Sequence, residues 1–295
     1  MTEIKKQESK VVEKYMKNIT KPIIVLYHAR CPDGFGGAWA AWKKLGSRAS
    51  YIPVVHQEPP PLLKDKSIYS IDFSYPEREL VKLIRNNKCL VVIDHHKTSE
   101  SILNLPSEAL YDINHSGAVL SWRYFHPGKK IPNLLNYIED RDLFTMRLSK
   151  TRELLNNLDI LPHDFKMWSK LVRDFEDPKK LKLLRERGEL LFAQFKCFVQ
   201  EIAHRGVLVK FHGKRVLAVN APPPFTSMVG HALYARVPSF SIVYHYLGPD
   251  LKVSLRSNGK INVRNMAEKY GGGGHDAAAG FLIKNAKGVP WEYIL

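Results

Sequence analysis

Apolar residues in the first part of the chain form short continuous runs that alternate with segments of helical periodicity. The runs lie at 23–28 (IIVLYH), 67–73 (SIYSIDF) and 89–94 (CLVVID), and helical patterns follow at 37–45 and 76–86. Strands that read as continuous apolar runs are usually buried on both faces, and the intervening helices can cover those faces. This pattern predicts an α/β fold with a parallel sheet.

The middle of the chain is predicted to be strongly helical. From Leu181 onward apolar residues recur at helical spacing, which indicates a helix of about seven turns. This stripe contains a glycine and two phenylalanines, so we expect it to pack within the protein, although a coiled-coil dimer stays open. Its members are Leu184, Gly188, Leu191, Phe195, Phe198 and Ile202. A short lead-in helix is also predicted over 9–19, with Val12, Tyr15, Met16 and Ile19 on one face.

The last part of the chain predicts a second, smaller α/β unit. Strand patterns lie at 205–212, 214–221, 240–247 and 251–257, and a helical pattern lies at 226–235. The predicted organisation is an N-terminal helical extension at 1–20, a parallel-sheet domain at 21–165, a helical linker at 166–203 and a smaller α/β domain at 204–295.

Composition narrows the functional class. The chain has 295 residues, of which 44% are apolar and 25% charged, as expected for an ordinary globular protein. No apolar run reaches the ~18 residues of a membrane span, and no secretory signal is evident. The cysteines (Cys31, Cys89 and Cys197) are too few for a disulfide framework, so a cytoplasmic location is expected. The net charge of +16 favours anionic partners such as nucleic acid, nucleotides or polyphosphate.

Aspartate and histidine residues gather where the predicted strands end. They are His28 and Asp33 after the first run, Asp72 at the second, and Asp94, His95 and His96 at the third, with Asp140 and Asp142 after a later helical segment. The carboxyl ends of parallel strands meet at one edge, and clustered carboxylates are tolerated there mainly when a cation neutralises them. Mixed Asp and His ligands suit Mn²⁺, Mg²⁺ or Fe²⁺ better than a structural zinc site.

Several of these segments resemble motifs of the DHH phosphoesterase superfamily. They are HARCPDGFGG at 28–37, SIDFS at 70–74, VVIDHHKT at 91–98 and EDRDLF at 139–144. SLRS at 254–257 and GGGGHDAAAG at 271–280 resemble the DHH-associated C-terminal domain. The resemblance covers roughly residues 22–284 and is carried by motifs in the family's order.

The resemblance implies a role for each matching residue. His28 and Asp33 would hold one metal ion, Asp72 would bridge two ions, His95 would bind the second, and Asp140 would complete the set. Asp140 is preferred to its neighbour because it fits the family's pattern better.

The catalytic residues implied by the resemblance are Asp94, His95 and His96. Asp94 would orient the histidines, and His96 would face the phosphate as an electrophile or proton donor. Many family members carry two aspartates in the first motif, whereas this loop offers only Asp33 beside Cys31. Further candidate ligands are Asp94, Asp142 and Cys31.

The implied activity is a phosphodiesterase that releases nucleoside monophosphates from short RNA or DNA oligonucleotides or dinucleotides. The implied cofactors are two Mn²⁺ ions, with Mg²⁺ or another divalent ion as the alternative. The substrate would be bound by Arg256, Ser257, Gly272, Gly273, Gly274 and His275, with the glycines forming an anion cradle. The start of the helix capped by Ser116 could also contact phosphate. Alternatives are a single-strand exonuclease, a cyclic-dinucleotide phosphodiesterase, a polyphosphate or pyrophosphate hydrolase, and a nucleic-acid-binding protein with a degenerate site.

Overall fold

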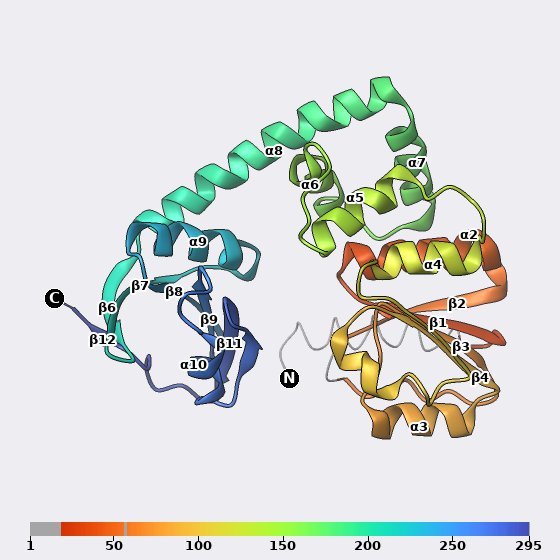
Figure 1. Ribbon diagram of the computed structural model, residues 1–295, viewed down its shortest axis with the longest axis horizontal. Coiled ribbons are helices and arrows are strands. Elements are labelled where there is room, and N and C mark those ends of the chain that lie inside the picture. The colour runs from red at the N-terminus through yellow and green to blue at the C-terminus, as the bar shows by residue number, and fades with distance from the viewer. Residues whose placement is uncertain (1–18, 56–57, 295) are drawn as a thin grey trace. The chain divides into compact units, whose positions relative to one another are not determined.

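The chain forms two compact units, 1–191 and 192–295 (Figure 1). The structure is a computed structural model and describes residues 19–55 and 58–294. Except at their last residues, the predicted helix over 9–19 and the extension at 1–20 lie outside the described residues. A long helix, α8 (Pro178–His204), runs from the first unit into the second.

The first unit is built on the predicted parallel sheet. Its strands are β1 (Ile23–His28), β2 (Ala49–Val54), β3 (Ser67–Ile71), β4 (Cys89–Asp94) and β5 (Glu108–Tyr111). They lie in the order β2-β1-β3-β4-β5, and all neighbours run parallel. The strand order reverses at β1, as in doubly wound folds.

The two strands of this unit that are absent from the sequence prediction are the edge strands β2 and β5. The central strands are buried on both faces and read as apolar runs, whereas β5 is only exposed or half-buried. An edge strand needs no continuous apolar run, so its sequence gives a weak signal.

Helices cover both faces of this sheet, with α2 and α4 on one face and α3 on the other (Figure 1). Alternate residues of β1 separate the two cores, since Val25 and Tyr27 belong to one buried cluster and Ile24 and Leu26 to the other. The helices of this unit are α2 (Pro32–Leu45), α3 (Glu77–Asn86), α4 (Gly117–Phe125), α5 (Asn133–Asp142), α6 (Thr151–Asp159) and α7 (Phe165–Glu176).

The apolar stripe of α8 packs against parts of the same chain. A Cβ at Gly188 would lie 1.8 Å from the carbonyl oxygen of Glu153, so α8 approaches α6 closely. Further along, Phe195 stacks on Phe225 with ring centroids 4.9 Å apart. Phe198, by contrast, is 49% exposed.

The second unit is a mixed seven-stranded sheet with strand order β10-β11-β9-β8-β7-β6-β12. Its strands are β6 (Val207–Phe211), β7 (Lys214–Asn220), β8 (Phe240–Leu247), β9 (Asp250–Ser257), β10 (Gly273–His275), β11 (Ala278–Ile283) and β12 (Glu292–Tyr293). Its helices after α8 are α9 (Thr226–Arg236) and α10 (Arg264–Glu268). The predicted α/β class, with two sheets joined by a long helix, is confirmed. Among the described residues, no helix combines the length and apolarity that a bilayer crossing would require.

Candidate active site

The candidate site lies at the carboxyl edge of the parallel sheet. His28 is the last residue of β1, and Asp72 directly follows β3. Because β1 is the strand at which the order reverses, these two residues flank the position where open α/β sheets bind ligands. β4 ends at Asp94, and His95 comes next. The parallel topology thus brings together residues that are far apart in the sequence.

Asp72 is buried and faces two histidines. It is 1% exposed, and its backbone has φ 54, a left-handed conformation that few non-glycine residues adopt. Its Oδ2 lies 3.5 Å from Nδ1 of His28, and its Oδ1 lies 3.2 Å from Nε2 of His95. Burial raises the pKa of Asp72, but its polar interactions with His28 and His95 outweigh burial and lower the pKa to about 2. The carboxylate of Asp72 therefore lies between the imidazoles of His28 and His95.

The imidazole of His95 lies among carboxylate oxygens. Besides Asp72, its Nε2 is 3.4 Å from Oδ2 of Asp142 and 3.7 Å from Oδ2 of Asp33. Both this nitrogen and Oδ1 of Asp72 are buried without a partner in hydrogen-bonding geometry. Buried polar atoms are nearly always hydrogen-bonded, and neighbouring carboxylates repel one another. The arrangement fits ligands grouped around a cation.

Asp33 is held by the start of α4. Its carboxylate accepts hydrogen bonds from the backbone N–H groups of Gly117 at 2.7 Å and Ala118 at 3.0 Å. Burial, followed by the charges of Asp72 and Asp142, raises its pKa well above the ordinary value. Ser116 caps α4 as predicted, since its hydroxyl accepts from the Val119 N–H. The predicted phosphate contact at this helix start is not supported, because Asp33 already occupies two of its donors.

The geometry reverses the choice between the two aspartates of the EDRDLF motif. The carboxylate of Asp140 accepts hydrogen bonds from the hydroxyls of Thr145 and Thr151 and from the backbone N–H groups of Arg147 and Leu148. These bonds organise the chain that follows α5. Asp142, one helical half-turn further, is the residue beside His95. The sequence preference for Asp140 as a ligand is therefore corrected to Asp142.

Asp94 and His96 form a fixed pair beside the cluster. Asp94 is fully buried, and its carboxylate is within 2.7 Å of Nδ1 of His96 and accepts from the hydroxyl of Ser99 and the backbone of His95. The hydrogen bond with Asp94, opposed by burial, raises the pKa of His96 to about 9. The raised pKa favours the protonated form of His96, which is compatible with the predicted proton-donor role.

The glycines of the first motif serve packing. Gly34, Gly36 and Gly37 all lie inside α2, and none of them has a positive φ, so they do not form an ion-binding turn. A Cβ at Gly34 would lie 2.3 Å from the carbonyl oxygen of His28, so this glycine lets the first turn of α2 pack against the end of β1.

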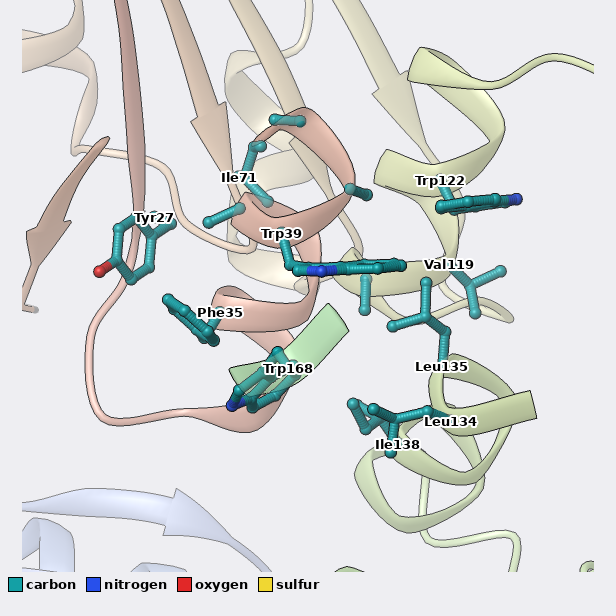
Figure 2. Close-up of a cluster of buried hydrophobic side chains, with 14 of the residues drawn as sticks. Tyr27, Phe35, Trp39, Ile71, Val119, Trp122, Leu134, Leu135, Ile138 and Trp168 are labelled. Atoms are coloured by element: carbon teal, nitrogen blue, oxygen red, sulfur yellow. The ribbon is translucent and has the colours of Figure 1, made fainter. Parts of the chain in front are cut away.

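Phe35, two residues after Asp33 in the first motif, belongs to the hydrophobic core. Its side chain is 1% exposed and points into the core beside Tyr27 and Trp168 (Figure 2). Its ring lies 4.8 Å from that of Trp168 and stacks on His163 and Phe165. A carboxylate at this position would be buried and would lose this packing, so position 35 is structural.

The potential ligands form three overlapping groups in which one donor atom of each residue lies within 4.8 Å of the others. The groups are His28, Cys31 and Asp72; Asp72, His95 and His96; and Asp33, His95 and Asp142. The predicted pairing of His28 with Asp33 is therefore replaced by separate groups that Asp72 and His95 connect. Without a cation, burial and the charge of Asp72 raise the pKa of the Cys31 thiol to about 12.

In the second unit, two predicted substrate-binding residues share one row of the sheet. Arg256 of β9 pairs with Ala278 of β11, which pairs with His275 of β10. Directly opposed residues point to the same face of a sheet. Nη2 of Arg256 lies 3.3 Å from the hydroxyl of Ser227 in α9, and His275 is exposed. Arg256 and His275 thus lie on one face of the sheet with Ala278 between them.

The hydroxyl of Ser257, also predicted to bind substrate, has structural contacts instead. It donates to the carbonyl oxygen of Ile261 and accepts from the N–H of Gly259, so it stabilises a turn. Ser257 is 4% exposed and does not face a ligand surface.

The glycine run forms part of a hairpin at the sheet edge and not an open loop. A Cβ at Gly272 would lie 2.2 Å from the carbonyl oxygen of Gly280, and Gly274 has φ +137 and meets Ala278. Of the three predicted cradle glycines, only Gly273 faces open space. The other two are therefore explained by close strand packing.

Sequence reasoning missed two polar supports of these side chains. Ser227 contacts Arg256, and Ser99 holds Asp94. Ser227 is far in sequence from the motif that contains Arg256, and Ser99 follows Asp94 at a spacing that matches neither a helix nor a strand period. The sequence therefore gave no sign that either serine supports a site residue.

Residues 238–290 match the DHHA1 domain family. Over 92% of its length the chain is 30% identical to an uncharacterised protein, R106, of Acanthamoeba polyphaga mimivirus, and the match covers 70% of that protein. A shorter match, 55% identical, joins 14% of the chain to 12% of the bifunctional oligoribonuclease and PAP phosphatase NrnA of Mycoplasma genitalium.

Solved structures with a similar fold include the pGpG-specific phosphodiesterase PggH from Vibrio cholerae. That structure is 18% identical with a TM-score of 0.50, over 90% of this chain and 94% of that one. The DHH domain of a protein placed in a family of ribosomal proteins is 14% identical with a TM-score of 0.55, over 99% of this chain and 89% of that one. At these identities the likeness concerns the fold.

Proposed function

Because the chain belongs to the DHH superfamily of phosphoesterases and carries a DHHA1 domain, we propose that it is a metal-dependent phosphodiesterase acting on short oligonucleotides or dinucleotides. The products would be nucleoside monophosphates. The observation that carries this proposal is the position of His95 Nε2, buried without a hydrogen bond among oxygens of Asp33, Asp72 and Asp142 at 3.2–3.7 Å. Buried carboxylates gathered around one imidazole favour an ion-binding enzyme over a binding protein with a degenerate site.

The candidate metal ligands lie on both sides of Asp72. One ion would be held by Asp33, His95 and Asp142, and another by the group around His28, with Asp72 between them. Two such ions, Mn²⁺ or Mg²⁺, would lower the pKa of an attacking water and neutralise charge on the phosphoryl oxygens. The buried, rigid strand ends supply the fixed geometry that such a site requires.

His96 has the properties of a proton donor to the phosphate. Its Nδ1 is held by Asp94 at 2.7 Å, so the opposite ring nitrogen is the one that would meet the substrate. Its side chain is 40% exposed, unlike the neighbouring His95 at 10%. The imidazolium would bind a phosphoryl oxygen and transfer a proton to the leaving oxygen.

The second unit would bind the nucleotide. The guanidinium of Arg256 suits a phosphate or a base edge, and His275 adds a second donor on the same face of the sheet. The names of two similar proteins, an oligoribonuclease and a pGpG-specific phosphodiesterase, support short nucleic-acid substrates for this chain.

The test is a panel of metals and substrates applied to the purified chain. Linear and cyclic dinucleotides, RNA and DNA oligomers of increasing length, and pyrophosphate would each be incubated with Mn²⁺, Mg²⁺ or Co²⁺, and products resolved by chromatography. We expect nucleoside monophosphates from the short linear substrates. Preference for long single strands would favour an exonuclease, and phosphate release from pyrophosphate would favour the hydrolase alternative.

A matched pair of variants tests whether activity depends on the candidate site and not on surface charge. Asp142→Asn should remove nearly all activity, whereas Asp159→Asn, which changes an exposed partner of Arg141, should leave it unchanged. If the wild-type chain binds oligonucleotides but hydrolyses none with any divalent ion, the enzyme proposal fails and the binding alternative stands.

A further inference from the structure

One of the candidate ligand groups contains sulfur. Sγ of Cys31, a ring nitrogen of His28 and an oxygen of Asp72 lie within 4.8 Å of one another. The group of Asp33, His95 and Asp142 offers only carboxylate oxygen and imidazole nitrogen. The two groups are therefore chemically different, although they lie side by side.

The local sequence places the sulfur at this position. Cys31 precedes Pro32 and is extended (φ −119, ψ 128), as residues before proline tend to be, and α2 starts directly after it. The tight contact between Gly34 and the carbonyl oxygen of His28 brings the first turn of α2 against the end of β1. Cys31 therefore reaches the strand end from the helix start, where the N–H groups favour a negative charge.

A second observation points to a ligand in this place. Asp72 is 1% exposed and its backbone adopts φ 54, and its Oδ2 lies 3.5 Å from Nδ1 of His28, so a buried carboxylate faces this group; its unpartnered Oδ1 faces His95 instead. The other two cysteines, Cys89 and Cys197, belong to no such group among the described residues. The grouping is thus specific to Cys31.

We propose that Cys31 is a thiolate ligand, so that this protein binds two different metals: a thiophilic ion at His28, Cys31 and Asp72, and a harder ion at Asp33, His95 and Asp142. The proposal rests on the proposed metal-dependent function and defines its cofactor. Thiolates select ions such as Zn²⁺, Co²⁺ or Fe²⁺, whereas carboxylate-rich sites accept Mn²⁺ and Mg²⁺. When the sulfur binds an ion, the thiol proton passes to solvent and no electron is transferred.

Cys31 completes a set of three donors. It lies two residues before Asp33 in the sequence, and it supplies the third donor that the His28 group would otherwise lack.

The experiment is a Co²⁺ titration of the metal-free, full-length protein without oxygen, followed by near-ultraviolet absorption. Wild type should develop a sulfur-to-cobalt charge-transfer band that saturates at one Co²⁺ per chain. Cys31→Ser should lose the band, and its affinity for Co²⁺ should fall by at least about tenfold. Removing a group that only supports a metal ligand lowers metal affinity by about 10–100-fold, so removing a ligand itself should have at least the smaller of these effects. Cys89→Ser and Cys197→Ser should keep it.

A further variant excludes a folding artefact. Cys31→Asp should lose the band but still bind two ions, with its preference shifted from Co²⁺ and Zn²⁺ toward Mn²⁺.

The outcomes distinguish this inference from the proposed function. If the wild type binds two ions and hydrolyses its substrate without any sulfur band, the thiolate proposal is overturned and the function stands. If no divalent ion binds at all, both are overturned. A band that persists in Cys31→Ser would also reject the assignment.

Discussion

The two aspartates of α5 give the sharpest test of the site, because sequence and structure rank them differently. Asp140 is 4% exposed and accepts four hydrogen bonds, from Thr145 at 2.6 Å, Arg147 at 2.7 Å, Leu148 at 3.1 Å and Thr151 at 2.5 Å. We predict that Asp140→Asn destabilises the protein and leaves metal affinity within a few-fold of wild type.

The magnitude follows from the lost acceptor. Asparagine keeps one oxygen but places an N–H₂ group against the Leu148 N–H and the Thr151 hydroxyl. A hydrogen bond to a charged group contributes about 1.5–3 kcal/mol, and an unsatisfied buried donor costs about 1–3 kcal/mol. Because such losses are not additive, we expect a total of about 2–4 kcal/mol in the free energy of unfolding.

The pH dependence has a defined sign. Burial raises the pKa of Asp140, but the hydrogen bonds, first those of Thr145 and Thr151, lower it below the ordinary value. A carboxylate with a lowered pKa stabilises the fold above its unfolded pKa, and this contribution is lost as the pH falls through the folded value. The difference between wild type and Asp140→Asn should therefore be largest at neutral pH and shrink below about pH 4.

The assay combines urea unfolding at several pH values with calorimetric titration of Mn²⁺. The matched variant is Asp142→Asn, for which we expect the opposite pattern: stability is kept and Mn²⁺ binding is weakened. Burial and then the charge of Asp72 raise the pKa of Asp142, so removing its charge should leave the metal-free protein equally or slightly more stable. It should weaken Mn²⁺ binding by at least about tenfold. If Asp140→Asn abolished Mn²⁺ binding while stability stayed at the wild-type value, the assignment of the two aspartates would be refuted.

Further outcomes are expected for four other variants. Gly34→Ala places a methyl group 2.3 Å from the carbonyl oxygen of His28, so both the urea midpoint and the affinity for divalent ions should fall; equal midpoints would contradict the packing role. His96→Gln should lower kcat by about 10²–10⁴-fold, the usual contribution of a proton donor, with metal affinity unchanged by calorimetry. Arg256→Lys should raise KM for dinucleotides with little effect on kcat. Ser257→Ala should lower only stability, by about 1 kcal/mol for the lost turn hydrogen bonds. If Ser257→Ala alone changed KM, its hydroxyl would contact the substrate.

The glycine-rich segments show where local pattern misleads. Gly34 and Gly272 both stand in motifs that resemble phosphate- or ion-binding loops, yet each glycine is required where another backbone comes within 2.3 Å of a would-be Cβ. The sequence shows that glycine occupies the position, but it does not show which neighbouring atom excludes a side chain there. That neighbour is a residue of another element, which only the folded chain brings close.

The amino-acid order alone determined the fold class, the family and the set of strand-end acids and imidazoles, because burial on both faces of a parallel sheet imposes continuous apolar runs and ends them at a common edge. The edge strands β2 and β5 left no such pattern. The tertiary structure alone decided how the candidate ligands divide. Asp140 and Asp142 are two residues apart on one helix, so they point in different directions, one into hydrogen bonds with the following loop and the other toward His95. Likewise, Cys31 joins His28 and Asp72 only because a helix start packs against a strand end, a contact that no local spacing encodes.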